Sequence, residues 1–152
     1  MLPHSASVAE WVLRWWLRSD RVTISVGVAA AIITHAREAQ PNECCGLLLG
    51  TPTHVAAAVR ARNLAEDPTR RYLIDPQDHL NAIRLARQRG DQVVGAYHSH
   101  PSSNAAPSST DAAQGFSQFL WVIAGLGTEP PELTAWTWSD GNFAAVALVR
   151  VP

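Results

Sequence analysis

The chain has 152 residues, of which 47% are apolar and 16% are charged, and its formal net charge is −1. This length suits one domain with a substantial core, and the composition excludes disordered and fibrous proteins. The 12 basic residues, all arginine, are balanced by 13 acidic ones, so we expect no nucleic-acid or membrane partner. The only cysteines, Cys44 and Cys45, are adjacent and cannot form a disulfide framework, which favours a reducing, cytoplasmic location.

The first 20 residues predict an amphipathic helix that stands apart from the domain over residues 21–152. Its apolar residues recur at helical spacing, and they are Val8, Trp11, Val12, Trp15 and Trp16. Glu10 and Arg14 interrupt the apolar run, so it predicts neither a signal peptide nor a membrane span. We expect this Trp-rich helix to pack within the chain or to form a homodimer interface.

From residue 21 onward, hydrophobic periodicity and turn residues predict alternating strands and helices. In chain order we expect a strand at 21–25, a helix at 26–40, strands at 44–50 and 54–62, a helix from Pro76 to about Arg89, a strand at 92–98, a helix at 108–118, a strand at 119–125, and a hairpin of strands 132–139 and 142–151. The interleaved elements and the final hairpin predict one α/β domain with a mixed β-sheet flanked by helices.

The residues that suggest chemistry follow the strand at 92–98. His98 and His100 are two residues apart on extended backbone, so their side chains point to the same side. Neutral imidazole binds zinc well, and hydrolytic zinc sites use three protein ligands with one position left open. Asp111 is the candidate third ligand, because the Ser-rich and Pro-rich loop after His100 can fold back. Ser108 and Asp111 also match a helix capping box, which is compatible with ligation.

A hydrolytic metal site also needs a group that moves protons. Glu43 is the candidate, because it immediately precedes the apolar strand at 44–50 and would lie at the edge of the core. The alternative interpretation is a solvated loop residue between a helix and a strand.

Together these residues resemble the signature of the JAMM (MPN+) metalloproteases. The signature is carried by Glu43, by His98-x-His100-Pro101 and by Ser108-x-x-Asp111. The likeness covers about residues 21–150, and it includes Pro41-Asn-Glu43-Cys-Cys-Gly46-Leu-Leu-Leu-Gly50, Asn63, Arg71-Tyr72, Asp75-Pro76 and the strand Val93-Val-Gly95-x-Tyr97. The Trp-rich helix lies outside it.

The resemblance implies a cytidine-deaminase-like JAMM/MPN fold around one zinc ion per chain. It implies that His98, His100 and Asp111 are the zinc ligands, that Glu43 activates the zinc-bound water and then protonates the leaving amine, and that Ser108 hydrogen-bonds the oxyanion. The family cleaves amide or isopeptide bonds after the Gly-Gly tail of ubiquitin-like proteins. In short bacterial members, the implied substrate is a sulfur-carrier protein.

Two other functions remain open on the sequence alone: a catalytically silent scaffold or binding module of the same fold, and a small-molecule zinc amidohydrolase. The cytidine deaminases themselves require H-x-E and P-C-x-x-C, and this sequence contains neither. We do not expect Cys44 and Cys45 to be ligands, because a strand turns them to opposite faces. The remaining histidines have no partner at ligand spacing, and they are His4, His35, His54 and His79.

Overall fold

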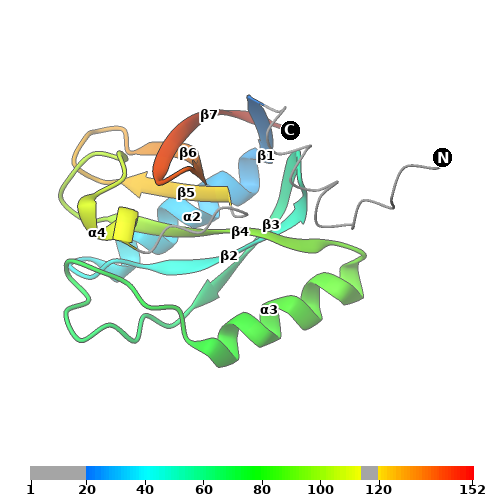
Figure 1. Ribbon diagram of the computed structural model, residues 1–152, viewed down its shortest axis with the longest axis horizontal. Helices are drawn as coiled ribbons and strands as arrows, with labels where there is room; N and C mark the ends of the chain where they lie inside the picture. The colour runs from blue at the N-terminus through cyan, green and yellow to red at the C-terminus, as the bar shows by residue number, and fades with distance from the viewer. Residues whose placement is uncertain (1–19, 114–119) are drawn as a thin grey trace.

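The computed structural model describes residues 20–113 and 120–152 (Figure 1). In chain order its elements are β1 (Arg21–Ser25), α2 (Val26–Ala39), β2 (Cys45–Thr51), β3 (His54–Ala61), α3 (Pro76–Arg89), β4 (Gln92–His100), α4 (Ser109–Ala113), β5 (Leu120–Gly125), β6 (Glu132–Ser139) and β7 (Asn142–Val151). The predicted Trp-rich helix and its homodimer interface lie outside the described residues, as do positions 114–118 of the helix predicted at 108–118. The division into two regions therefore stays a prediction.

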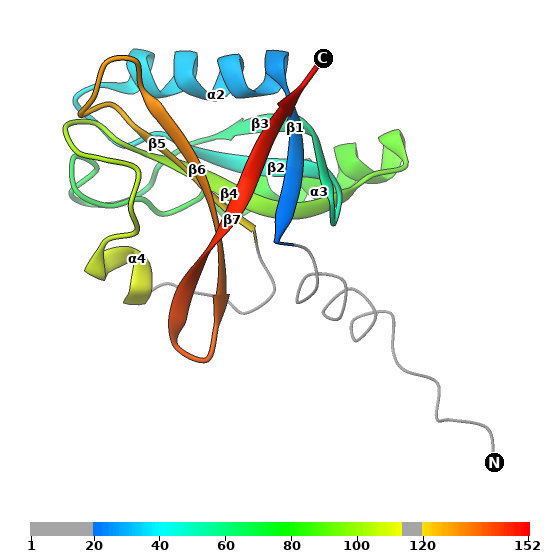
Figure 2. The same ribbon diagram turned by 90° about the horizontal axis from the view of Figure 1, so that it is seen from above.

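The seven strands form one closed barrel in the order β1-β3-β2-β4-β5-β6-β7. β1 pairs in parallel with both β3 and β7, and β4 pairs in parallel with β5, whereas the other pairs are antiparallel. Figure 2 shows β1 and β7 side by side where the barrel closes. The mixed sheet with its helices confirms the α/β class. The closure was not predicted, and the cytidine-deaminase-like architecture stays a prediction.

Helices cover both faces of β2, which explains its continuous apolar sequence. Leu48 packs in the core cluster that contains Ile32 of α2. Leu47 and Leu49, which point the other way, pack against Ala82 and Ala86 of α3. Figure 1 shows α2 and α3 on opposite sides of β2 and β4. A strand buried on both faces forms a rigid base for residues at its ends.

The described helices have local sequence features that fix their ends. Ser25 begins α2, and its hydroxyl accepts a hydrogen bond from the Val28 amide. Asp75 begins α3 in the same way, and Gly90 ends that helix with a left-handed φ of 73°. No helix within residues 20–113 and 120–152 combines the length and apolarity that a bilayer span requires.

The pairing of β2 with β4 brings Glu43 to the histidines. Cys45 lies opposite His98 in this antiparallel pair. The next pair is Cys44 with Ser99, because the Ser99 amide donates to the Cys44 carbonyl at 3.1 Å and the Cys44 amide donates to Ser99 Oγ at 2.8 Å. Glu43 therefore comes opposite His100, with both at the same end of the sheet. β4 continues to His100, two residues beyond its predicted end.

Candidate metal centre

The three predicted ligands converge at the end of β4. His98 Nε2 lies 3.2 Å from His100 Nε2 and 3.1 Å from Asp111 Oδ1. His100 Nε2 lies 3.2 Å from Asp111 Oδ2. All three side chains are buried. The structure thus gathers two strand residues and one residue of α4 into a compact donor set.

The spacing of these donor atoms fits a tetrahedral metal ion. Zinc is bound at about 2.0–2.1 Å by imidazole nitrogen, which places neighbouring ligand atoms of a tetrahedron about 3.3 Å apart. The three separations of 3.1 to 3.2 Å are close to this value. Two imidazoles and a carboxylate are also ligands of the kind that zinc prefers.

The hydrogen bond of His100 to the loop leaves the Nε2 lone pair available to a metal ion. His100 Nδ1 lies 2.8 Å from the carbonyl oxygen of Asn104. A carbonyl only accepts, so Nδ1 carries the hydrogen, and the neutral ring has its lone pair on Nε2. That lone pair faces the Asp111 carboxylate, an arrangement that needs a proton or a cation between them. Burial lowers the pKa of His100, but the hydrogen bonds to Asp111 and Asn104 outweigh it and the net shift is upward.

Asp111 is held by a reciprocal cap at the start of α4. The Ser108 amide donates to Asp111 Oδ2 at 2.8 Å, and the Asp111 amide donates to Ser108 Oγ at 3.1 Å. This arrangement is the predicted capping box, and it orients the carboxylate toward the histidines. Burial raises the pKa of Asp111, but hydrogen bonds from His100 and His98 hold it well below its usual range. Asp111 is therefore a carboxylate.

Aromatic rings enclose His98. Tyr72 stacks on its ring at a centroid distance of 4.5 Å, and Trp121 approaches edge-on at 6.3 Å. Burial lowers the pKa of His98 and keeps the ring neutral, as metal binding requires. In the sequence, Tyr72 belongs to the segments that carry the family resemblance, and Trp121 has no predicted role. The apolar strand at 119–125 gave no indication that one of its side chains would reach the site.

Glu43 lies beside the histidines, with 6% of its surface exposed. Glu43, His98 and His100 each offer a ligand atom, and these atoms lie within 4.8 Å of one another. Unlike Asp111, the Glu43 carboxylate makes no hydrogen bond to either imidazole among the described residues. Burial raises the pKa of Glu43 to about 7, with His100 opposing the shift and Asp111 adding to it. A carboxyl group with this pKa exchanges protons readily at neutral pH.

The loop at residues 63–75 fixes the backbone of Glu43. The Glu43 amide donates to the Pro68 carbonyl at 2.7 Å, and Asn63 Nδ2 donates to the Glu43 carbonyl at 3.1 Å. Asn63 Oδ1 also accepts from the amides of Ala65 and Leu73. Asn63, which the sequence showed only as part of the resemblance, therefore ties both ends of this loop to Glu43.

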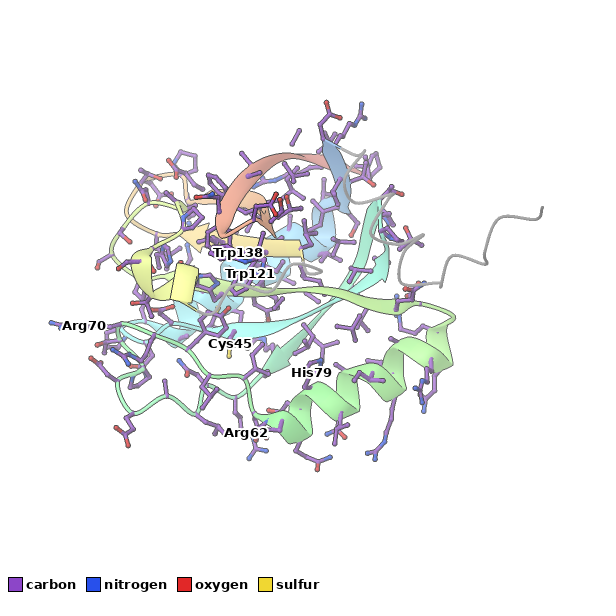
Figure 3. The ribbon with its side chains drawn as sticks, viewed as in Figure 1. Cys45, Arg62, Arg70, His79, Trp121 and Trp138 are labelled. Atoms are coloured by element: carbon purple, nitrogen blue, oxygen red, sulfur yellow. The ribbon has the colours of Figure 1, made fainter. Side chains whose placement is uncertain are left out.

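An open cleft gives access to the donor set. A hollow of about 350 Å³ is lined by Glu43, His100 and Ser108. It shares four lining residues with a second hollow of about 600 Å³ that reaches Gln40 and Pro41, and these four are Thr69, Arg70, Pro101 and Ser102. Figure 3 shows Arg70 at the outer edge of the molecule, on the loop that borders the cleft. The two hollows adjoin along these four residues, and the smaller one reaches His100 and Glu43.

The cysteines are buried as free thiols. Cys44 belongs to the core cluster on the α2 side, and Cys45 packs with Tyr72 and Trp121. Burial raises the pKa of Cys44 to about 11 and that of Cys45 to about 12. Metal ligation requires the thiolate, so neither residue suits a ligand role.

Two of the other histidines have partners away from the donor set: His35 contacts the Tyr97 hydroxyl, and His54 contacts the Thr23 hydroxyl.

Comparison with known proteins gives consistent matches over most of the chain. A family model described as prokaryotic homologs of the JAB domain matches residues 25–139. A desampylase of Haloferax volcanii is 30% identical over 139 residues, which are 87% of this chain and 98% of that protein. The CysO-cysteine peptidase of Mycobacterium tuberculosis is 30% identical over 92 residues, which are 59% of this chain and 62% of that protein.

Solved structures share the fold. A protein of Desulfitobacterium hafniense superimposes with a TM-score of 0.78 at 26% identity, over 86% of this chain and 92% of that one. A JAB1/MPN domain protein of Archaeoglobus fulgidus gives a TM-score of 0.53 at 22% identity, over 85% of this chain and 97% of that one. The second likeness concerns the fold alone.

Proposed function

Because this chain belongs to the family of prokaryotic homologs of the JAB domain, as its motifs predicted, we propose that it is a zinc-dependent peptidase or isopeptidase. We propose further that it hydrolyses the amide bond after the C-terminal Gly-Gly tail of a ubiquitin-like or sulfur-carrier protein. Relatives named desampylase and CysO-cysteine peptidase support this substrate class. The observation that carries the proposal is the convergence of His98, His100 and Asp111 beside Glu43 at the end of an open cleft.

His98 and His100 would hold zinc through Nε2, and Asp111 would hold it through its carboxylate. Zinc bound there supplies a Lewis acid that polarises the scissile carbonyl and lowers the pKa of water. The hydrogen bond from His100 Nδ1 to the Asn104 carbonyl keeps the Nε2 lone pair available. The hydrogen bond from the Ser108 amide to Asp111 Oδ2 orients the Asp111 carboxylate toward the metal position.

Glu43 would transfer the protons of the reaction. As a carboxylate it accepts a proton from the attacking water, and as the acid it delivers that proton to the departing amine. Its pKa of about 7 makes both forms accessible at neutral pH. The backbone hydrogen bonds to Pro68 and Asn63 fix it in place for both steps.

Ser108 would stabilise the negative oxygen of the tetrahedral intermediate. Its hydroxyl oxygen accepts from the Asp111 amide, which leaves the hydroxyl hydrogen free to point into the cleft. A fixed donor at the position where charge develops lowers the barrier most.

The open cleft favours a protein tail over a small molecule. A small-molecule amidohydrolase encloses its substrate in a pocket that buries most of its surface. Here two adjoining open hollows are lined by residues from Gln40 to Ser108, and such an open surface suits an extended polypeptide segment. A diglycine tail is flexible and lacks side chains, so it can approach the histidines closely.

Incubation with a carrier protein tests the proposal. We expect a β-grasp protein extended beyond its Gly-Gly by a peptide, or joined there to a lysine side chain, to be cut to a product that ends in Gly-Gly. Intact mass spectrometry detects that product. A zinc chelator should abolish cleavage and added zinc should restore it, because the ligand set provides no substitute Lewis acid.

Each alternative function gives a different result in this experiment. Protein that carries no zinc after purification without chelator, and cuts neither substrate, would indicate a silent scaffold. Protein that hydrolyses small amides but leaves the carrier intact would indicate a small-molecule amidohydrolase. A preference for the peptide or the lysine conjugate identifies the bond that is cut.

Replacing Ser108 should slow turnover without loss of metal. We expect Ser108→Ala to lower kcat by about 10²–10³-fold, the cost of removing one oxyanion donor. Loss of the cap should also destabilise the protein by about 1 kcal/mol, which thermal melting measures separately. Ser109→Ala is the matched control, because Ser109 is the exposed first residue of α4 and is not among the residues that line the cleft. An unchanged kcat in Ser108→Ala would remove the oxyanion role.

A further inference from the structure

Three side chains of β6 fix a single residue of the loop that follows His100. Glu132, Thr134 and Trp136 alternate along the strand and therefore share one face. The Ala105 amide donates to Glu132 Oε2 at 3.2 Å, and Thr134 Oγ1 donates to the Ala105 carbonyl at 2.6 Å. Trp136 Nε1 donates to Thr134 Oγ1 at 2.8 Å and reaches the Ala105 carbonyl at 3.3 Å. Ala105 is thus held at both its backbone groups.

Gly125 gives this loop room to cross β5. It lies between His100 of β4 and Glu132 of β6 in the sheet. A Cβ at this position would lie 2.5 Å from the Ala105 nitrogen and 2.6 Å from the Asn104 carbonyl carbon, closer than real contacts allow. The backbone at 104–105 therefore passes directly over Gly125, between the ligand strand and the strand that fixes it.

This loop backbone contacts a predicted metal ligand. The Asn104 carbonyl, which forms one peptide group with the Ala105 amide, accepts the hydrogen bond from His100 Nδ1 at 2.8 Å. His98 Nδ1, in contrast, has no partner in the described part of the chain. Of the two histidines, only His100 therefore has a hydrogen-bonded support there. Such partners set the tautomer and ring orientation of metal-bound histidines.

We propose that Glu132, Thr134 and Trp136 are positioning residues of the metal centre. By fixing Ala105 they hold the Asn104 carbonyl against His100 Nδ1, and so they keep the His100 lone pair aimed at the metal position. Thr134 has the central part, because its hydroxyl both donates to Ala105 and accepts from Trp136. The inference rests on the proposed function, since it assigns zinc to the site, and it extends the site to a strand that carries none of the predicted ligands.

Thr134→Val tests the inference, because valine has nearly the same shape but no hydroxyl. We expect zinc affinity, measured by competition with a chromophoric chelator, to fall about 10–100-fold, the usual cost of losing an outer partner of a ligand. Thr134→Ser should restore the affinity, because it restores the hydroxyl. Trp136→Phe removes only the indole donor and should give a smaller loss. Thr137→Val is the matched control on the same strand, where the hydroxyl makes no hydrogen bond among the described residues.

Two further readouts separate positioning from general destabilisation. The visible absorption of bound Co²⁺ should change in Thr134→Val and not in Thr137→Val, since it reports the geometry of the ligands. Thermal melting of the metal-free proteins shows whether both variants fold. If Thr134→Val binds zinc like the wild type and with the same cobalt spectrum, the inference fails while the proposed function stands. If the wild type itself binds no zinc, the proposed function fails and the inference with it.

Discussion

Glu43→Gln is expected to bind zinc as tightly as the wild type. Its kcat is expected to be about 10²–10⁴-fold lower, because one proton-transferring group contributes a factor of that size. Glutamine keeps the shape of the side chain and the backbone hydrogen bonds to Pro68 and Asn63, so the site stays assembled. It cannot accept a proton from water, nor return one to the leaving amine. Cleavage of a Gly-Gly-extended carrier, followed by intact mass, measures turnover, and metal analysis measures zinc.

The two measurements together separate the possible roles of Glu43. Its carboxylate lies within 4.8 Å of the ligand atoms of His98 and His100, so a direct metal contact is the competing assignment. Zinc lost together with turnover would make Glu43 a ligand, and turnover close to that of the wild type would exclude it as the base. Glu66→Gln is the matched control, because Glu66 is an exposed glutamate of the adjoining loop.

Much of the fold could be predicted because local periodicity decides it. Leu47, Leu48 and Leu49 form an apolar run that predicts a strand buried on both faces, and α2 and α3 provide the two coverings. His98 and His100 could be placed on one side of a strand from their spacing alone. Ser108 and Asp111 formed the capping box that their spacing predicts.

The remaining features depend on contacts between distant segments, which local patterns do not encode. Closure of the barrel requires β1 to pair with both β3 and β7, and a five-residue strand gives no indication of two partners. The placement of Glu43 opposite His100 follows from the register of β2 on β4. The contacts of Thr134 with Ala105 join residues 29 positions apart. The motif contains the residues proposed to do the chemistry, but it does not contain Glu132, Thr134 or Trp136, which contact the loop after His100.

His100→Ala is expected to lower zinc affinity by more than the roughly 100-fold that loss of an outer partner costs, because it removes a direct ligand. Its Nε2 lies 3.2 Å from His98 Nε2 and from Asp111 Oδ2, and His98 is the only other histidine in the donor group found among the described residues. Competition with a chromophoric chelator measures the loss. His79→Ala is the matched control: Figure 3 shows His79 on α3, which packs against β2 and β4 and provides none of the predicted ligands.

The outcome for His100→Ala also tests the ligand set as a whole. Without the imidazole, His98 and Asp111 remain, and two ligands hold zinc weakly unless a third donor moves in. Glu43 is the nearest carboxylate that can do so. If His100→Ala keeps its zinc and then loses it when Glu43→Gln is added, the carboxylate has replaced the imidazole. If zinc stoichiometry and affinity are unchanged in both variants, His100 is not a ligand, and the metal centre proposed here is wrong.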